Sequence, residues 1–87
     1  MKLNECFVLR EIKDKYFLVA VMNNEFTNNL ININEVAAKI LSLANEGHNI
    51  EKIIEDLSIE YNADLNRISV DVKSFIQYAL ENKILIN

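Results

Sequence analysis

The sequence predicts an α+β fold in which a three-stranded antiparallel sheet precedes three helices, a winged helix-turn-helix-like order with the sheet placed first. Two patterns predict it: strand-forming apolar runs fill residues 7–33, and polar caps followed by apolar stripes of helical spacing fill the remainder. The chain has 87 residues, 51% of them hydrophobic, with one glycine and no proline. Because that length suffices for one core, residues 1–87 are predicted to form a single domain.

The first two strands are predicted over residues 7–12 and 16–22, joined by a tight polar turn at residues 13–15. The second run is apolar on both of its alternating faces, which predicts a central strand. We expect helices to cover one face of that strand, and a partner or a tail could cover the other.

A turn at residues 23–25 is predicted before a third strand over residues 27–33. Alternation puts Asn29, Ile31 and Ile33 on one face, so we expect Ile31 and Ile33 to enter the core. In a simple meander this strand is an edge, and its outward N–H and C=O groups are available to pair.

Three polar residues, Asn34, Asn49 and Asp64, are predicted to cap helices that end near residues 46, 61 and 82. Gly47 is expected to end the first helix in the left-handed conformation, and Asn82 the third. The closing residues 84–86 are expected to form an extended segment over the core. The predicted buried stripes comprise Val36, Ala37, Ile40, Leu41 and Ala44; Ile50, Ile53, Ile54, Leu57 and Tyr61; and Leu65, Ile68, Val72, Phe75, Ile76 and Ala79.

Composition excludes several classes of function. Cys6 is the only cysteine and His48 the only histidine, so we expect no metal site, no cofactor and no nucleophile–base pair. The sequence predicts no secretion signal and no membrane span, which indicates a cytoplasmic protein. Without a phosphate-binding loop or a catalytic constellation, we expect no enzyme activity.

Four segments resemble the family named for pyrroloquinoline-quinone synthesis protein D (PqqD). Residues 30–40 (Leu-Ile-Asn-Ile-Asn-Glu-Val-Ala-Ala-Lys-Ile) resemble the family's strand exit, and residues 71–76 (Asp-Val-Lys-Ser-Phe-Ile) are similar to its Asp-Val-x-x-Phe-Leu signature. Residues 49–53 and 61–64 match its second helix and the tyrosine that follows. The chain departs from the family at Lys83, where a glycine is frequent, and in the turn before the third strand, where the family commonly has a glycine.

This resemblance implies a precursor-peptide recognition element for ribosomally made, post-translationally modified peptides. Such a domain holds a leader peptide as an added strand, against the third strand and beside the third helix. It presents the leader to a modifying enzyme, either a radical S-adenosylmethionine enzyme or a leader protease, and performs no reaction itself.

The residues are compatible with that mode, since an edge strand beside a helix can hold an added strand. Helical spacing groups Ser69, Lys73 and Leu80 on one flank of the third helix, although the opposite flank with Asp71 and Tyr78 could face the peptide instead. The candidate peptide-binding residues are Asn28, Asn29, Leu30, Ile31, Asn32, Arg67, Ser69, Lys73, Ile76, Gln77 and Leu80.

Each candidate has a structural alternative. Ile76 and Leu80 could simply close the core, because apolar helix positions are usually buried. Arg67 and Lys73 could pair with an acidic leader residue or remain solvated.

Two other functions stay open. A winged helix could bind nucleic acid, but the net charge of −4 and the balanced charges of the third helix argue against phosphate contacts. An orphan interaction scaffold would use the same edge strand, and a homodimer through that edge is also open.

Overall fold

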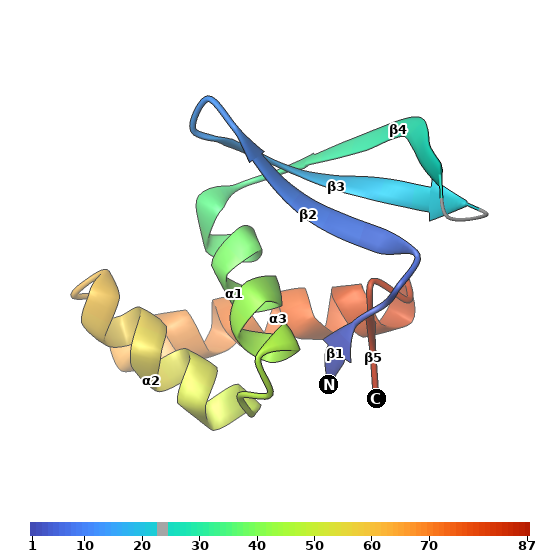
Figure 1. Ribbon diagram of the computed structural model, residues 1–87. Coiled ribbons are helices and arrows are strands. Elements are labelled where there is room, and N and C mark those ends of the chain that lie inside the picture. The colour runs from blue at the N-terminus through green and yellow to red at the C-terminus, as the bar shows by residue number, and fades with distance from the viewer. Residues whose placement is uncertain (23–24) are drawn as a thin grey trace.

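The computed structural model packs three helices against one face of a three-stranded antiparallel sheet (Figure 1). It describes residues 1–22 and 25–87, and of residues 25–29 it describes the backbone alone. The α+β class and the order of sheet before helices are therefore confirmed. Both chain ends lie on the helix side of the sheet, so neither described end covers the outer face (Figure 1).

The strands β2 (Phe7–Ile12), β3 (Lys15–Met22) and β4 (Glu25–Ile33) pair in the order β2-β3-β4. Lys13 and Asp14 form the turn, which is one residue shorter than predicted because Lys15 opens β3, and both have positive φ values, 51° and 65°. Such values at both central residues fit a two-residue hairpin, whose twist matches that of the flanking strands. The central position of the second strand is confirmed.

The third strand begins two residues earlier than predicted. Glu25, which we assigned to a turn, opens β4 and pairs with Met22. The other two residues of that predicted turn, Asn23 and Asn24, lie outside the described residues. The register between β3 and β4 shifts between Val19 and Val21, so an irregularity interrupts the ladder there.

The helices are α1 (Glu35–Asn45), α2 (Ile50–Glu60) and α3 (Leu65–Glu81). All three predicted caps are confirmed, because the side chains of Asn34, Asn49 and Asp64 accept hydrogen bonds from first-turn amides at 2.7–2.8 Å. Each cap thus satisfies an amide that has no partner inside its helix.

The end of α3 differs from the prediction. Asn82 has an ordinary φ of −94°, and Lys83 takes the left-handed conformation at φ 58°. The Ile84 amide donates to the Ala79 carbonyl and the Lys83 amide to the Leu80 carbonyl, which is the Schellman pattern. This pattern requires the left-handed residue one position beyond the cap. Gly47 occupies the equivalent position after α1, at φ 96°, as predicted.

A short second sheet closes the core beneath the helices. β1 (Lys2–Leu3) pairs with β5 (Leu85–Ile86), joining the two ends of the chain. The extended segment at the C-terminus was predicted, but its partner β1 was not. Ile84 and Leu85 are 4% and 1% exposed, so this segment does cover the core.

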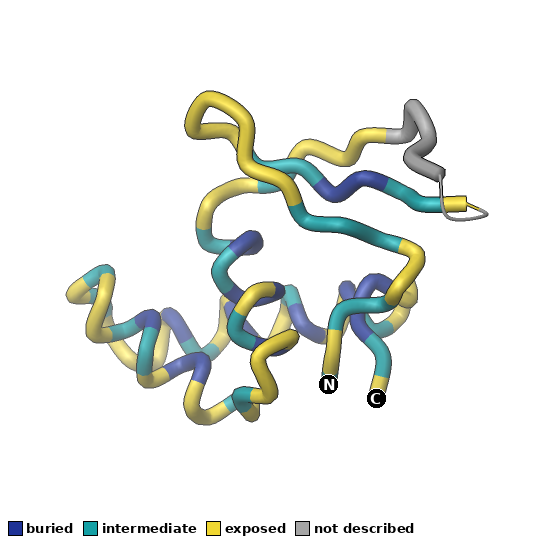
Figure 2. Tube along the Cα trace, in the orientation of Figure 1, coloured by how far each residue is buried: buried dark blue, intermediate teal, exposed yellow. Residues whose placement is uncertain are grey.

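Most of the predicted apolar stripes form a single core, shown in Figure 2 as the buried segments of the helices and of β3. In the three-stranded sheet, Leu18 is fully buried within it. Leu65 was expected in this core but is 55% exposed, since it lines an open hollow beside α2. The fully buried large side chains are Leu18, Ile40, Leu41, Ile53, Leu57, Val72, Ile76 and Leu85.

Candidate functional site

The outer edge of β4 carries backbone groups that have no strand beside them in the described sheet. The Val21 amide donates to the Cys6 carbonyl, so the odd-numbered residues of β3 bond to the β2 side. Backbone groups alternate between the two sides of a strand, so Tyr16 and Leu18 bond to Ile33 and Ile31 of β4. The intervening residues Leu30 and Asn32 therefore direct their N–H and C=O groups outwards.

The face of β4 that is turned towards the helices is only partly covered. Leu9, Leu18 and Ile31 stand in one row across the three strands. Leu18 is 0% exposed, whereas Ile31 is 42% exposed, because no described element covers the β4 end of the row. The prediction that Ile31 enters the core is therefore wrong. The same prediction for Ile33 is confirmed, because Ile33 packs against the core.

A hollow of about 250 Å³ lies where β4 ends and α1 begins, across from α3. Its floor is mostly apolar, and one carboxylate stands among its lining residues. The edge of β4 and this hollow together form the site that we call the β4 groove. The hollow is lined by Asn34, Val36, Ala37, Ile40, Asp71 and Phe75.

The structure orients α3, which the sequence alone did not. Asp71 and Phe75 line the hollow beside α1, and the Phe75 ring lies 6.2 Å from that of Tyr78, which is 53% exposed. This flank of α3 therefore faces the β4 groove. We had named it as the alternative to the predicted flank.

The flank chosen from the sequence faces α2 instead, so its predicted position beside the third strand is corrected. Ser69 and Lys73 line a hollow with α2, and Leu80 lines another with the start of α2. Gln77 donates to the Glu81 carboxylate on the exposed surface. The physical reason is that α2 packs on this side of α3.

The remaining predicted residues are placed as follows. Leu30 and Ile31 lie on β4 and are 57% and 42% exposed. Ile76 is 2% exposed and belongs to the core, the alternative that we had weighed for it. Arg67 precedes Asp71 by one helical turn, which puts it on the flank of the β4 groove. Of the strand asparagines, Asn32 is exposed, while the side chains of Asn28 and Asn29 lie outside the described part.

On α3, Phe75 is a groove residue that our sequence-based site missed, because we assigned it only to the core. It is indeed partly buried and packs against the core. A helix residue at the border of an apolar stripe can serve both core and groove, and its spacing is the same in either case. The signal that could have found it is its place beside Asp71 and Tyr78 on one flank.

A polar network ties α1 to α2 next to the groove. The Tyr61 hydroxyl donates to the Glu35 carboxylate at 2.7 Å, and the Lys39 ammonium pairs with Glu60 and lies 5.0 Å from the centre of the Tyr61 ring. Burial, with the hydrogen bond to Glu35 and its charge, raises the pKa of Tyr61 to about 12. The hydroxyl is therefore protonated at neutral pH and serves as a donor.

The described residues offer no cluster of side chains that could hold a metal ion. Across residues 1–22 and 25–87, no three His, Cys, Asp or Glu side chains converge as metal ligands. His48 lies in the turn after α1 with Nδ1 3.4 Å from the Asp56 carboxylate, and Cys6 is exposed. Of the helices described, none is long and apolar enough to cross a membrane.

Fold and groove together define a small α+β domain with an open strand edge beside a helix. The family model of coenzyme PQQ synthesis protein D (PqqD) matches residues 19–85, which cover the end of the central strand, β4 and all three helices. The chain therefore belongs to the PqqD family, and the resemblance noted in the sequence is confirmed.

A solved structure shares the fold. The structure of TbiB1 in complex with the TbiA(beta) leader peptide superposes with a TM-score of 0.78 at 24% sequence identity, over 98% of this chain and 94% of the other. A search of curated proteins finds no match.

Proposed function

We propose that this protein is a non-catalytic adaptor that binds the leader segment of a ribosomally made precursor peptide. The leader adds as a strand to β4, in the groove that β4 forms with α3. The observation that carries the proposal is the pair of outward backbone positions, Leu30 and Asn32, on the strand that leads to the partly apolar hollow at Asn34. Strand addition uses backbone bonds for affinity and side-chain pockets for selection, and this edge offers both.

Two comparisons support the proposal. Membership of the PqqD family links the chain to cofactor synthesis, and a protein of the same fold has been solved with a leader peptide. In our proposal the bound leader is presented to a modifying enzyme, either a radical S-adenosylmethionine enzyme or a leader protease.

The groove residues that we propose for the helix side are Asp71, Phe75 and Tyr78, in place of Ser69 and Lys73. Phe75 and Tyr78 offer aromatic surface at the open edge of the core. Aromatic side chains contribute strongly to binding at interfaces, because they bury a large area with few rotatable bonds.

The winged helix-turn-helix comparison is retained only as a description of element order. A nucleic-acid-binding role would need a basic surface, and the net charge of −4 argues against one. A gel shift with mixed-sequence DNA at low salt tests this alternative, and we expect no complex.

The test of leader binding is a titration of isotope-labelled protein with the leader half of a short peptide encoded beside this gene. We expect saturable amide shifts at Leu30 to Ile33 and along the Asp71 to Asn82 flank of α3. An unchanged spectrum at high peptide excess would overturn leader binding for that pair. Shifts confined to Ser69, Lys73 and Gln77 would instead overturn the groove assignment.

A further inference from the structure

The sheet has a second open edge, on β2, and a helix stands beside it as well. β2 pairs with β3 alone in the described sheet, on the side opposite β4. The odd-numbered residues of β3 bond to Val8, Arg10 and Ile12, so the backbone groups of the residues between them point outwards. The Phe7 amide already donates to Asn4, which leaves Leu9 and Glu11 as the open positions.

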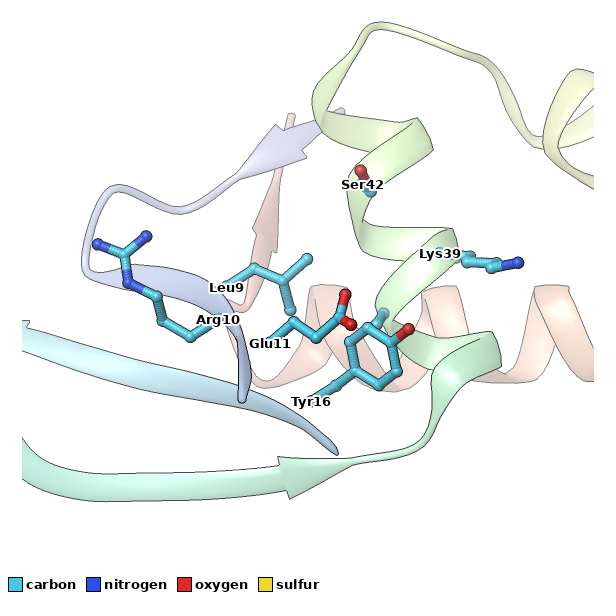
Figure 3. Close-up of a pocket in the computed structure, with 7 residues that line it drawn as sticks. Leu9, Arg10, Glu11, Tyr16, Lys39 and Ser42 are labelled. Atoms are coloured by element: carbon cyan, nitrogen blue, oxygen red, sulfur yellow. The ribbon is translucent and has the colours of Figure 1, made fainter. Parts of the chain in front are cut away.

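A hollow of about 330 Å³ separates this edge from α1. Figure 3 shows Leu9, Glu11 and Tyr16 directed towards α1. The side chains that α1 contributes include the small residues Ala38 and Ser42, one turn apart, which leave room between helix and strand. The β2 edge therefore has the same arrangement as the β4 groove, with an open strand edge beside a helix.

The carboxylate of Glu11 is the charged group directed into this hollow. Of the two cations among its lining residues, the Lys39 ammonium extends away and pairs with Glu60, and the Arg10 side chain points away from α1 (Figure 3). Burial and the nearby carboxylates Glu11, Glu35 and Asp14 all raise the pKa of Tyr16 above its ordinary value. An added strand with a cationic side chain facing the hollow would be complementary to this field.

We propose that the β2 edge is a second strand-docking site, which takes an extended segment of the modifying enzyme carrying a lysine or arginine opposite Glu11 and an apolar residue opposite Leu9. In an antiparallel pair these two residues are two positions apart, with the cation first along the partner chain. The docking site stands on the geometry of β2 and α1. Its role in presentation rests on the proposed function.

Occupants on opposite edges of one sheet do not compete, because β3 lies between them. The domain can hold a leader on β4 and an enzyme segment on β2 at the same time. This arrangement brings substrate and enzyme together without either partner displacing the other.

The test uses two short extended peptides on isotope-labelled full-length protein. The probe alternates threonine and valine, with lysine two positions before a leucine, and the matched control has glutamate in place of that lysine. We expect the lysine peptide to shift the Leu9 and Glu11 amides saturably at low salt, and to bind about three- to tenfold tighter than the control.

Variants test whether the hollow causes the preference for the lysine peptide. Glu11→Lys should invert the preference between the two peptides, whereas Glu5→Lys, an equal charge change at an exposed residue before β2, should preserve it. Ser42→Phe should weaken both peptides at least about threefold by filling the hollow, since Ser42 is exposed and its replacement leaves the core intact.

Three results would overturn the proposal: no shift on β2, equal binding of the two peptides, or shifts at Leu30 and Asn32 alone. A dimer that protects β2 in the free protein would also overturn it, because a second copy would already occupy the edge. A failed leader titration at β4 would leave these β2 measurements unaffected, so the two proposals fail separately.

Discussion

In the helices the apolar stripes meet in one enclosed core, with Leu65 at the start of α3 left exposed, whereas the two edge strands of the sheet leave large apolar side chains open to solvent. Leu41, Leu57 and Val72 are 0% exposed, while Ile12 and Leu30 are more than half exposed. The difference follows from geometry, because helices can surround a stripe but three strands necessarily end in two edges. We infer that the helices supply most of the stability and the sheet edges supply the binding surface.

The sharpest test of this division is Leu57→Ala in α2. Leu57 is fully buried, so we expect a loss of about 2–5 kcal/mol in the free energy of unfolding, from lost burial and the cavity left behind. The control is Ile59→Ala on the same helix, where a 72% exposed side chain should change stability by less than about 0.5 kcal/mol. Urea unfolding measures both, and equal losses would contradict the division.

The open edge is tested by Asn32→Pro, which removes an outward N–H without breaking the β3–β4 ladder. We expect leader affinity to fall about tenfold, or about 1.4 kcal/mol, while the fold is kept. Asn32→Ala retains the N–H and should bind within about twofold of the parent. Calorimetric titration measures both, and unchanged binding by the proline variant would show that the leader does not use this edge.

A polar contact inside the helical half is tested by Tyr61→Phe, which removes the hydrogen bond to Glu35. For this partly exposed pair we expect a loss of about 1 kcal/mol at pH 7, after allowing for solvent screening.

The burial of Tyr61 and the same bond together give a pH dependence. The pKa of Tyr61 rises in the folded state from 10 to about 12, so folding favours the protonated hydroxyl. The stabilisation is complete below pH 10 and is lost as the pH rises towards 12. We expect the stability difference between parent and Tyr61→Phe to shrink over that range, as measured by urea unfolding at each pH. A stability difference that stays constant over that range would show that folding does not raise the pKa of Tyr61.

The smallest effect is expected for Glu60→Gln, which breaks the ion pair with Lys39. Both side chains are at least a third exposed, so we expect a loss of about 0.5 kcal/mol or less, and smaller still in high salt. Thermal unfolding at two salt concentrations measures it. A loss of stability as large as that of Leu57→Ala would contradict the expectation that this surface ion pair contributes little.

Much of the fold could be predicted because its signals are local. The side chains of Asn34, Asn49 and Asp64 cap amides two or three residues away, so their sequence neighbours suffice to identify them. The pairing of β1 with β5 was missed, since a two-residue strand carries no periodicity and its partner lies at the far end of the chain.

The site was predicted less completely than the fold. The third strand and its open edge could be expected from alternation, but the exposure of Ile31 could not, because it depends on where the helices stop along the sheet. Phe75 was assigned to the core for the same reason, since its spacing is shared by buried and half-buried positions.

By itself the sequence determined the order of the three main strands and the three helices, the caps, the central strand and most of the buried stripes, because each of these depends on contacts along the chain or on its periodicity. Only the tertiary structure decided which flank of α3 faces the sheet. Both flanks border the same apolar stripe, and packing against α2 places Ser69 and Lys73 at a hollow beside that helix while leaving Asp71 and Phe75 beside the groove. The rotation of a helix about its axis is set by the partners on both sides, and those partners come from distant parts of the chain.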